Sequence, residues 1–213
     1  NLDVTYVMSH MASAEEDSPQ NALQLKRFLD ARQHLPMGRA SLCNSSGIFL
    51  GADYHFDLAR PGVALYGVNP TPARHNPMRS VVSLKARVLQ VRDAVSGDTV
   101  GYNATHTITA PTKIATVPVG YADGYSRALS NCGQAVINGI LVPVVGRVSM
   151  DLITLDVSAV PDADNLRGAW AELIGERPGI TLQDIAAAIG SNEYEVLTSL
   201  GRRYYRCYID AAN

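Results

Sequence analysis

The sequence predicts an α/β region followed by a mostly β region, and three observations lead to this fold class. Residues 1 to about 69 alternate short apolar strands with helical stretches, as parallel βαβ units do. From Pro70 to Arg74 the composition becomes loop-like, which predicts a domain boundary. Residues 82–91 then alternate with a period of two, which indicates a strand with one buried face. We therefore expect two domains, over residues 1–69 and 76–213.

The first region begins with an expected strand over residues 2–8. Ser18 and Pro19 then predict an N-cap and a first helical turn, and the apolar side of this helix ends near residues 35–36. That side consists of Leu23, Leu25, Phe28, Leu29 and Ala31. Residues 39–45 predict a second strand, residues 46–50 a short helical turn, and residues 58–65 a third extended element that Pro61 and Gly62 interrupt. A small, self-contained α/β layer is the alternative interpretation of this region.

The second region contains residue patterns that are typical of turns. Residues 95–98 predict a turn, and Asn138-Gly139 predicts a tight hairpin because both residues tolerate a positive φ. Further strands are expected over residues 99–109, 114–119, 135–137, 141–148, 152–157 and 204–209. One helix is expected, with a capping box from Thr181 to Asp184 and an end at Gly190.

Composition narrows the class of protein. A net charge of −2 without a basic run gives no reason to expect nucleic acid or a membrane surface as a partner. No apolar run approaches the ~18 residues that a membrane span needs. The cysteines Cys43, Cys132 and Cys207 are odd in number and widely spaced, which indicates a reducing, cytoplasmic location without a disulfide framework. No metal site is expected.

Because the chain starts at Asn1 directly in a strand, we expect it to be truncated.

Three segments carry the strongest functional signal: DLARPGVALYG at residues 57–67, VGYNAT at 100–105 and VGRVSMD at 145–151. Their order and spacing resemble the alanine racemase family of pyridoxal-phosphate (PLP) enzymes. The resemblance implies a (β/α)8 barrel followed by a β domain, so residues 1–69 would be the last βα units of the barrel. It also implies an isomerase that supplies D-alanine for bacterial peptidoglycan and acts as a homodimer with shared active sites.

The same resemblance exposes a missing part. The family holds PLP as a Schiff base on a lysine in an N-terminal segment like V-x-K-A-N-A-Y-G. The lysines here are Lys26, Lys85 and Lys113, and none has those neighbours. The arginine that binds the substrate carboxylate would likewise lie upstream of Asn1. These 213 residues alone are therefore expected to be inactive.

The resemblance assigns cofactor-binding roles to residues of the first region and to one tyrosine of the second. Ser45, Gly62 and Val63 would bind the phosphate, and Arg60 would donate to the pyridine nitrogen. Because arginine stays protonated and has no acceptor atom, it gives the ring nitrogen a hydrogen bond but no proton. This suits a racemase better than an enzyme whose carboxylate keeps the ring nitrogen protonated. His10 would lie against the ring and be linked to Arg60. Tyr194 would reach the phosphate and narrow the entrance.

The remaining assignments lie in the second region. Tyr102 would be the second catalytic base, supplied to the partner subunit, because racemisation needs a proton-transferring group on each face of Cα. Met150 would bind the carboxylate of alanine through its backbone N–H, and Tyr121 would line the entrance. Asn103 stands where relatives usually have glycine, and asparagine also tolerates a left-handed backbone.

Two alternatives remain beside alanine racemisation. One is a racemase of broader amino-acid range on the same scaffold. The other is a non-enzymatic dimerisation or interaction module. Decarboxylases of basic amino acids share the barrel, but they usually set an acidic residue on the pyridine nitrogen, which Arg60 disfavours.

Overall fold

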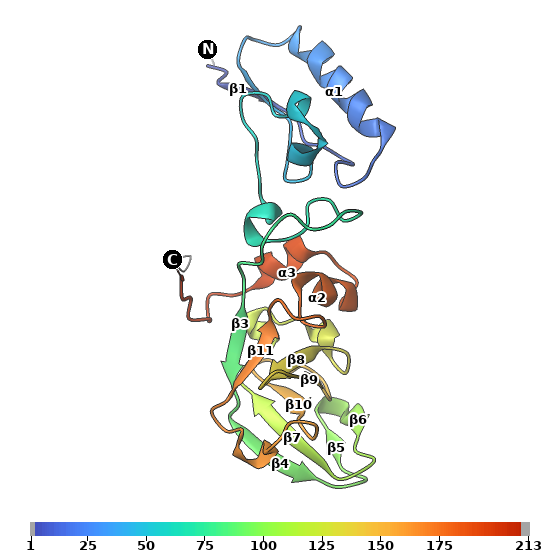
Figure 1. The fold of residues 1–213 in the computed structure, drawn as a ribbon, viewed down its shortest axis with the longest axis vertical. Coiled ribbons are helices and arrows are strands. Elements are labelled where there is room, and N and C mark those ends of the chain that lie inside the picture. Colours follow the sequence, from blue (N-terminus) through green and yellow to red (C-terminus); the bar gives the residue numbers. More distant parts are fainter. Residues whose placement is uncertain (1–2, 210–213) are drawn as a thin grey trace. The chain divides into compact units, whose positions relative to one another are not determined.

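The computed structural model describes residues 3–209 and divides into two compact units, residues 1–81 and 82–213 (Figure 1). The chain is mixed α/β, with most of its sheet in the second unit. In the described part of the chain, no helix combines the length and the apolar character needed to cross a membrane.

The first unit contains one βαβ arrangement. Strand β1 (Tyr6–Met8) pairs in parallel with β2 (Arg39–Ser41), and helix α1 (Pro19–Arg32) connects them. This confirms the predicted parallel pairing, although residues 1 and 2 of the expected strand lie outside the described residues. The chain continues through three 3₁₀ turns, η1 (Gly47–Leu50), η2 (Ala52–Tyr54) and η3 (Val63–Tyr66).

Helix α1 begins as predicted but buries a narrower face. The Ser18 hydroxyl accepts a hydrogen bond from the Gln20 N–H at 3.3 Å. Phe28 is buried and packs edge-on against Phe56, with 5.2 Å between ring centroids. Leu23 and Leu29 are 41% and 44% exposed. At 3.6 residues per turn, Leu23 and Leu29 point about 140° and about 100° away from Phe28. The apolar side predicted for this helix was therefore too wide.

The expected third extended element, residues 58–65, is wrong. The Arg60 N–H donates to the Cys43 carbonyl at 3.1 Å, Pro61 has no N–H to continue a ladder, and the chain turns into η3. The second strand also ends at Ser41 rather than residue 45, because the chain turns there and the Asn44 side chain accepts from the Gly47 N–H at 2.9 Å.

The second unit holds two main antiparallel sheets and one small hairpin. The four-stranded sheet has the order β3-β11-β8-β9, the three-stranded sheet β10-β7-β4, and β5 pairs with β6. The strands are β3 (Leu84–Arg87), β4 (Gln90–Ala94), β5 (Thr99–Val100), β6 (His106–Thr107), β7 (Thr112–Val117), β8 (Gln134–Ile137), β9 (Ile140–Pro143), β10 (Ile153–Asp156) and β11 (Trp170–Ile174).

The predicted strand over residues 82–91 is split between the two sheets. The Val88 N–H donates to Ala169 at 2.9 Å, beside β11, whereas the next N–H, of Leu89, donates to Thr116 of β7 at 2.9 Å. Two consecutive residues thus join different sheets, and periodicity alone could not place this switch. Residues 99–109 likewise form a hairpin, with the turn η4 (Tyr102–Ala104) between β5 and β6, rather than one strand. The expected strand 141–148 ends at Pro143, followed by an isolated bridge from Val144 to Leu155.

Both predicted turns are confirmed. Asn138 and Gly139 adopt φ values of 49° and 81° and connect β8 to β9, with Ile137 opposite Ile140. At residues 95–98 the Val95 N–H donates to the Asp98 carboxylate at 2.9 Å.

The C-terminal part of the second unit agrees with the prediction in one element of three. Helix α2 (Leu182–Ala188) has the predicted capping box, in which the Asp184 N–H donates to the Thr181 hydroxyl at 3.1 Å and the Thr181 N–H to the Asp184 carboxylate at 3.3 Å. Helix α3 (Glu193–Ser199) was not anticipated. The expected closing strand over residues 204–209 is wrong, since this segment is irregular; Tyr205 and Tyr208 are 94% and 89% exposed.

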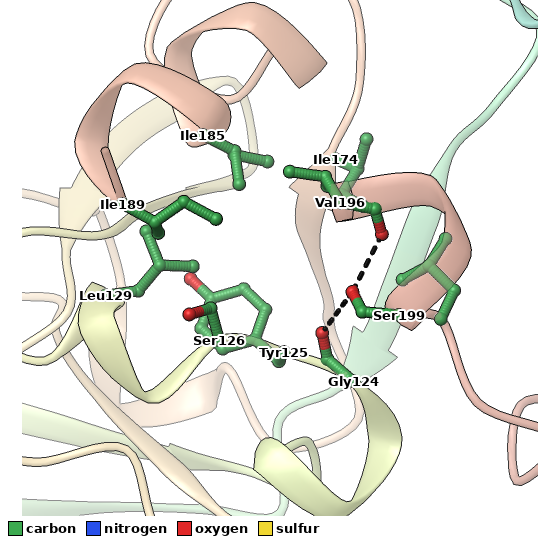
Figure 2. Close-up of a pocket in the computed structure, with 10 residues that line it drawn as sticks. Gly124, Tyr125, Ser126, Leu129, Ile174, Ile185, Ile189, Val196 and Ser199 are labelled. Atoms are coloured by element: carbon green, nitrogen blue, oxygen red, sulfur yellow. Dashed lines mark hydrogen bonds between the residues drawn. The ribbon is translucent and has the colours of Figure 1, made fainter. Parts of the chain in front are cut away.

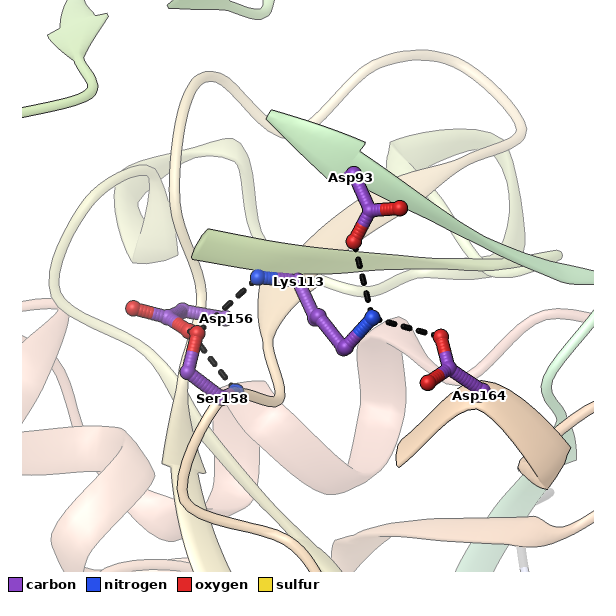
Figure 3. A network of polar contacts seen from close by, with 5 residues as sticks. All are labelled: Asp93, Lys113, Asp156, Ser158 and Asp164. Atoms are coloured by element: carbon purple, nitrogen blue, oxygen red, sulfur yellow. Dashed lines mark hydrogen bonds and ion pairs between the residues drawn. The ribbon is translucent and has the colours of Figure 1, made fainter. Parts of the chain in front are cut away.

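A polar network fixes β7 at the edge of its apolar core (Figure 3). The Lys113 ammonium donates to Asp93 of β4 at 2.8 Å and to Asp164 at 2.5 Å, and these hydrogen bonds, that of Asp164 first, raise the pKa of Lys113. The Lys113 N–H donates to the Ser158 hydroxyl, which itself donates to Asp156. Directly beyond Lys113, Ile114 is fully buried.

Candidate functional site

The first unit forms a compact polar cradle where β2 ends. The Ser45 hydroxyl is buried and accepts hydrogen bonds from the Gly62 N–H at 2.8 Å and the Ala64 N–H at 3.3 Å. A hydroxyl has two acceptor lone pairs and one proton, so these bonds leave the Ser45 proton to donate. A Cβ placed on Gly62 would meet only the Ser45 hydroxyl within 4 Å, at 4.0 Å, so the backbone here is open to close approach.

Two further groups of the cradle have unused donors. The Ser46 hydroxyl is buried and has no hydrogen-bond partner among residues 3–209. Within the same residues, no hydrogen bond engages the Val63 N–H. A buried polar group without a partner costs free energy, so its retention fits an anionic ligand with several oxygen atoms. The donor set of the cradle therefore suits a phosphate group.

Arg60 is fixed at the same strand end. Its Nη1 donates to the Ser41 hydroxyl, and its Nη2 donates to the Ser9 carbonyl at 2.6 Å and to the Leu42 carbonyl at 3.3 Å. A guanidinium carries five N–H donors, so Nε–H and one Nη1–H are not used by these three bonds. The arrangement can hold a positive charge and a donor in a fixed position toward a ligand acceptor.

Sequence reasoning missed Ser41 and Ser46. Ser41 lies on β2, is fully buried, accepts from Arg60 and donates to the Leu58 carbonyl at 2.6 Å. The available signal was the concentration of hydroxyl side chains over residues 41–46, ahead of Arg-Pro-Gly. Cys43 lies between Ser41 and Ser46 in the sequence. Burial raises the pKa of its thiol, which makes it a poor nucleophile.

His10 follows β1 and is exposed. Its carbonyl accepts from the Gln24 side chain at 2.5 Å, and it is the carbonyl of the preceding residue, Ser9, that accepts from Arg60. The structure thus brings the His10 segment to Arg60 through the backbone.

In the second unit the structure brings the turns of Tyr121 and Met150 together. The Tyr121 N–H donates to the Ser149 carbonyl and the Ala122 N–H to the Met150 carbonyl, both at 3.0 Å. A Cβ on Gly120 would lie 2.3 Å from the Met150 carbonyl oxygen, so only glycine permits this approach. The Tyr121 and Met150 residues are 44% and 53% exposed, which leaves both accessible to a ligand.

Tyr102 lies in the turn η4 and is 70% exposed, rather than on a strand as its segment predicted. The reason lies in the backbone, because Gly101, Asn103 and Ala104 have φ values of 79°, 60° and 49°, which no strand allows. The left-handed conformation of Asn103 agrees with the predicted tolerance at this position.

The VGYNAT and VGRVSMD segments contact each other. A Cβ on Gly101 would lie 2.6 Å from the Arg147 nitrogen, and one on Gly146 would lie 2.8 Å from the Val100 carbonyl oxygen. The two glycines therefore allow the backbones to touch, which anchors the turn of Tyr102 on the segment that leads to Met150.

Tyr194 lies in the first turn of α3 and is 41% exposed. The Asn192 side chain caps this helix by accepting from the Glu195 N–H at 3.0 Å. Thr198 donates to the Tyr194 carbonyl at 2.8 Å. These bonds fix the backbone from which the tyrosine ring extends.

A cavity under α2 and α3 is not a substrate site (Figure 2). Its volume of about 20 Å³ has room for roughly one water molecule. Its walls are mainly apolar, with Leu129, Ile174, Ile185, Ile189 and Val196 around it. Tyr125 also lines it, and burial raises the pKa of this tyrosine far above its ordinary value. In the described part of the chain, no group of three or more His, Cys, Asp or Glu side chains is arranged to hold a metal ion.

Family models match both units. Residues 1–70 match the N-terminal domain of alanine racemase, and residues 81–208 match its C-terminal domain. An alanine racemase of Rickettsia akari is 50% identical over 210 residues, which cover 98% of this chain and 57% of the relative. The catabolic alanine racemase of Agrobacterium fabrum is 48% identical, with 98% and 53% covered. The chain thus spans about half the length of the curated relatives it matches.

Solved structures are similar as well. The alanine racemase of Bartonella henselae with covalently bound pyridoxal phosphate has a TM-score of 0.90 and 42% identity, with 97% of this chain and 57% of that chain covered. The alanine racemase of Streptomyces coelicolor A3(2) has a TM-score of 0.88 and 35% identity, with 98% and 57% covered.

Proposed function

Because the chain belongs to the alanine racemase family, we propose that the protein carrying these residues interconverts L- and D-alanine with PLP as its cofactor. The observation that supports this most is the cradle of the first unit. It combines a hydroxyl that accepts two N–H groups, a buried hydroxyl without a partner and an arginine with unused donors. A phosphate and a ring nitrogen are the acceptors that this donor set suits.

Ser45, Ser46, Gly62 and Val63 divide the phosphate-binding role by their hydrogen bonds. The Gly62 N–H donates to the Ser45 oxygen, which leaves the Ser45 proton to donate to the ligand. The Ser46 hydroxyl and the Val63 N–H donate directly. When bound, PLP withdraws electrons from the amino acid so that the proton on Cα can leave. Tyr194 adds a hydroxyl to the phosphate end and narrows the entrance.

Arg60 binds the ring nitrogen through an N–H that its protein partners leave unused. Since a guanidinium stays protonated and has no acceptor atom, Arg60 gives the ring a hydrogen bond and no proton. The three bonds to Ser9, Ser41 and Leu42 keep it from moving as charge develops. His10, next to Ser9, lies against the ring.

The second unit supplies groups for the substrate. Tyr102 exchanges a proton with one face of Cα, and a lysine outside these residues serves the opposite face. The Met150 N–H binds the carboxylate of alanine, and Tyr121 lines the entrance. We place Tyr102 in the site of a partner subunit, so that the homodimer shares its active sites.

The architecture follows the same proposal. Residues 1–69 are the last βα units of a (β/α)8 barrel, and residues 76–213 are the mostly β C-terminal domain. The support is that β1 and β2 are parallel and form a sheet of only two strands among the described residues. Such a pair leaves edges that further strands can join. The location is cytoplasmic, and the D-alanine serves peptidoglycan synthesis.

The test is D-alanine formation from L-alanine by the purified full-length protein with PLP. We expect turnover in wild type, and a loss of about 100-fold in Arg60→Ala because the ring is no longer oriented. Arg39→Ala, which removes an exposed arginine of β2, is the matched control and should retain activity. Absence of turnover in wild type, with PLP bound, would contradict the proposal and favour an interaction module. Faster turnover of another amino acid would indicate a racemase of broader range.

A further inference from the structure

Arg203 connects the two turns that carry Tyr121 and Met150. Its Nε lies 3.2 Å from the Asp123 carboxylate, two residues after Tyr121. Its Nη2 lies 2.7 Å from the Asp151 carboxylate, the residue after Met150. One guanidinium therefore bridges two carboxylates on different turns, with a separate nitrogen of its planar donor set directed at each.

The bond between the turns sets the direction of the Met150 N–H. A peptide unit is planar and trans, so the Ser149 carbonyl and the Met150 N–H belong to one rigid plane and point in opposite directions. The Tyr121 N–H donates to that carbonyl at 3.0 Å. Any rotation of the Tyr121 turn relative to the Met150 turn therefore re-aims the Met150 N–H.

The ion pair between Arg203 and Asp123 differs from one in which both side chains are exposed. The Asp123 side chain is only 8% exposed and also accepts from the Gly120 N–H at 2.8 Å. A buried carboxylate needs a compensating charge. Among the described residues, the ion pair that Asp123 makes is with Arg203.

The segment before Arg203 packs tightly on the same turn. The Gly201 N–H donates to the Asp123 carbonyl at 2.8 Å. A Cβ on Gly124, whose φ is 94°, would lie 1.9 Å from the Ser199 carbonyl oxygen. The backbone thus delivers Arg203 to the Tyr121 turn in a fixed position.

We propose that Arg203 is a positioning residue which, through Asp123 and Asp151, aims the Met150 N–H at the substrate carboxylate. This inference rests on the proposed function, since it takes Met150 as the carboxylate donor. Arg203 itself touches no substrate. Its loss should weaken substrate binding more than it slows proton transfer.

The kinetic test compares Arg203→Gln with Arg202→Gln in the full-length enzyme. Arg202 is the adjacent exposed arginine, so the control removes the same charge without the bridge. In R203Q we expect the KM for alanine to rise about tenfold while kcat changes by less than about threefold. In R202Q both should stay near wild type. Arg203→Lys keeps the charge but loses the planar donor set that directs a separate nitrogen at each carboxylate, so its KM should lie between those of R203Q and wild type.

The second readout is amide hydrogen exchange in the cofactor-free enzyme, which does not depend on activity. In R203Q the Tyr121 and Ala122 amides should exchange about tenfold faster than in wild type, because local opening is easier. The Val145 amide, which donates to Thr154, should keep its protection.

The outcomes separate the two proposals. An unchanged KM in R203Q, or unchanged exchange at Tyr121, would overturn the role of Arg203. If R203Q unfolds, Asp151→Asn decides, because it removes the exposed end of the bridge and leaves the buried Asp123 paired with Arg203. A wild-type KM in this variant would equally overturn the role of Arg203. A wild-type enzyme without racemase activity would contradict the proposed function instead.

Discussion

The two units carry their candidate functional groups in different ways. In the first unit, Ser45 and Arg60 are held by side-chain hydrogen bonds at the end of a short parallel pair. In the second unit, Tyr102 and Met150 extend from turns that the backbone of a larger antiparallel fold positions, and both are more than half exposed. The first arrangement suits tight binding of a cofactor, and the second suits groups that meet a substrate which enters and leaves.

The hydrophobic core of the second unit is built on larger sheets than that of the first unit. The first unit has a sheet of two three-residue strands over a cluster that includes Met11, Phe28 and Leu42. The second unit has sheets of three and four strands, with Ile114, Leu155 and Leu173 fully buried. Burial of apolar side chains is the main favourable contribution to folding, and it increases with the apolar area removed from water. We therefore expect the second unit to be the more stable of the two.

These 213 residues alone should lack racemase activity. The first unit offers groups for the phosphate and the ring, but Lys26, Lys85 and Lys113 do not match the family's cofactor lysine. These 213 residues expressed alone, with excess PLP, should form no D-alanine. Turnover comparable to the full-length enzyme would refute this, as would covalent attachment of PLP to one of these lysines after borohydride treatment.

The next effect tests the difference between the cores. Leu155→Ala in the second unit should lower the free energy of unfolding by about 3 kcal/mol, because it leaves a cavity among fully buried side chains. Leu141→Ala, at a position 42% exposed, is the matched control and should cost less than about 1 kcal/mol.

Leu42→Ala tests the stability of the first unit. Leu42 is fully buried in the cluster of the first unit. Its replacement should expose the amides of β1 and β2 to hydrogen exchange while the amides of β7 keep their protection. Equal loss of protection in both units would show that they do not differ in stability as described.

The smallest effect is the acid sensitivity of the α2 cap. Although burial opposes ionisation, hydrogen bonds from the Thr181 hydroxyl and from the Gly179 and Thr181 N–H groups hold the pKa of Asp184 below its ordinary value of 3.8. A lowered folded-state pKa stabilises the fold above the unfolded value and is lost as pH falls through the folded value. Asp184→Asn should therefore cost about 1 kcal/mol at pH 7 and progressively less below about pH 4. Chemical denaturation at several pH values measures this, and a constant difference down to pH 2 would contradict the cap's role.

The elements predicted well are those fixed by local chemistry. The Ser18 cap, the Asn138-Gly139 hairpin and the Thr181 capping box each depend on residues within a few positions, so the sequence contains their full cause. The split of residues 82–91 depends on Ala169 and Thr116, which lie far away in the chain. The irregular segment 204–209 shows the same limit, because alternation predicts a strand only where a partner strand exists.

The candidate site divides along the same line. The hydroxyl-rich turn and the Arg-Pro-Gly segment were visible, and the structure joins them through the Ser45 hydroxyl. The bridge of Arg203 could not be predicted from the sequence, because Asp123 and Asp151 each lie more than 50 residues before this arginine. The turn at Tyr102 was hidden for a different reason, because its left-handed residues include Ala104, which gives no such signal.

Tyr102 is the acid–base group that we propose the second unit supplies for one face of Cα. The most direct measurement is exchange of the Cα proton of L- and D-alanine in deuterated water, followed by NMR, for full-length wild type and Tyr102→Phe. Tyr205→Phe, at a tyrosine 94% exposed, serves as the matched control. We predict that Tyr102→Phe loses exchange by about 100-fold or more for one enantiomer and partly retains it for the other. Near wild-type exchange for both enantiomers would show that Tyr102 does not transfer this proton.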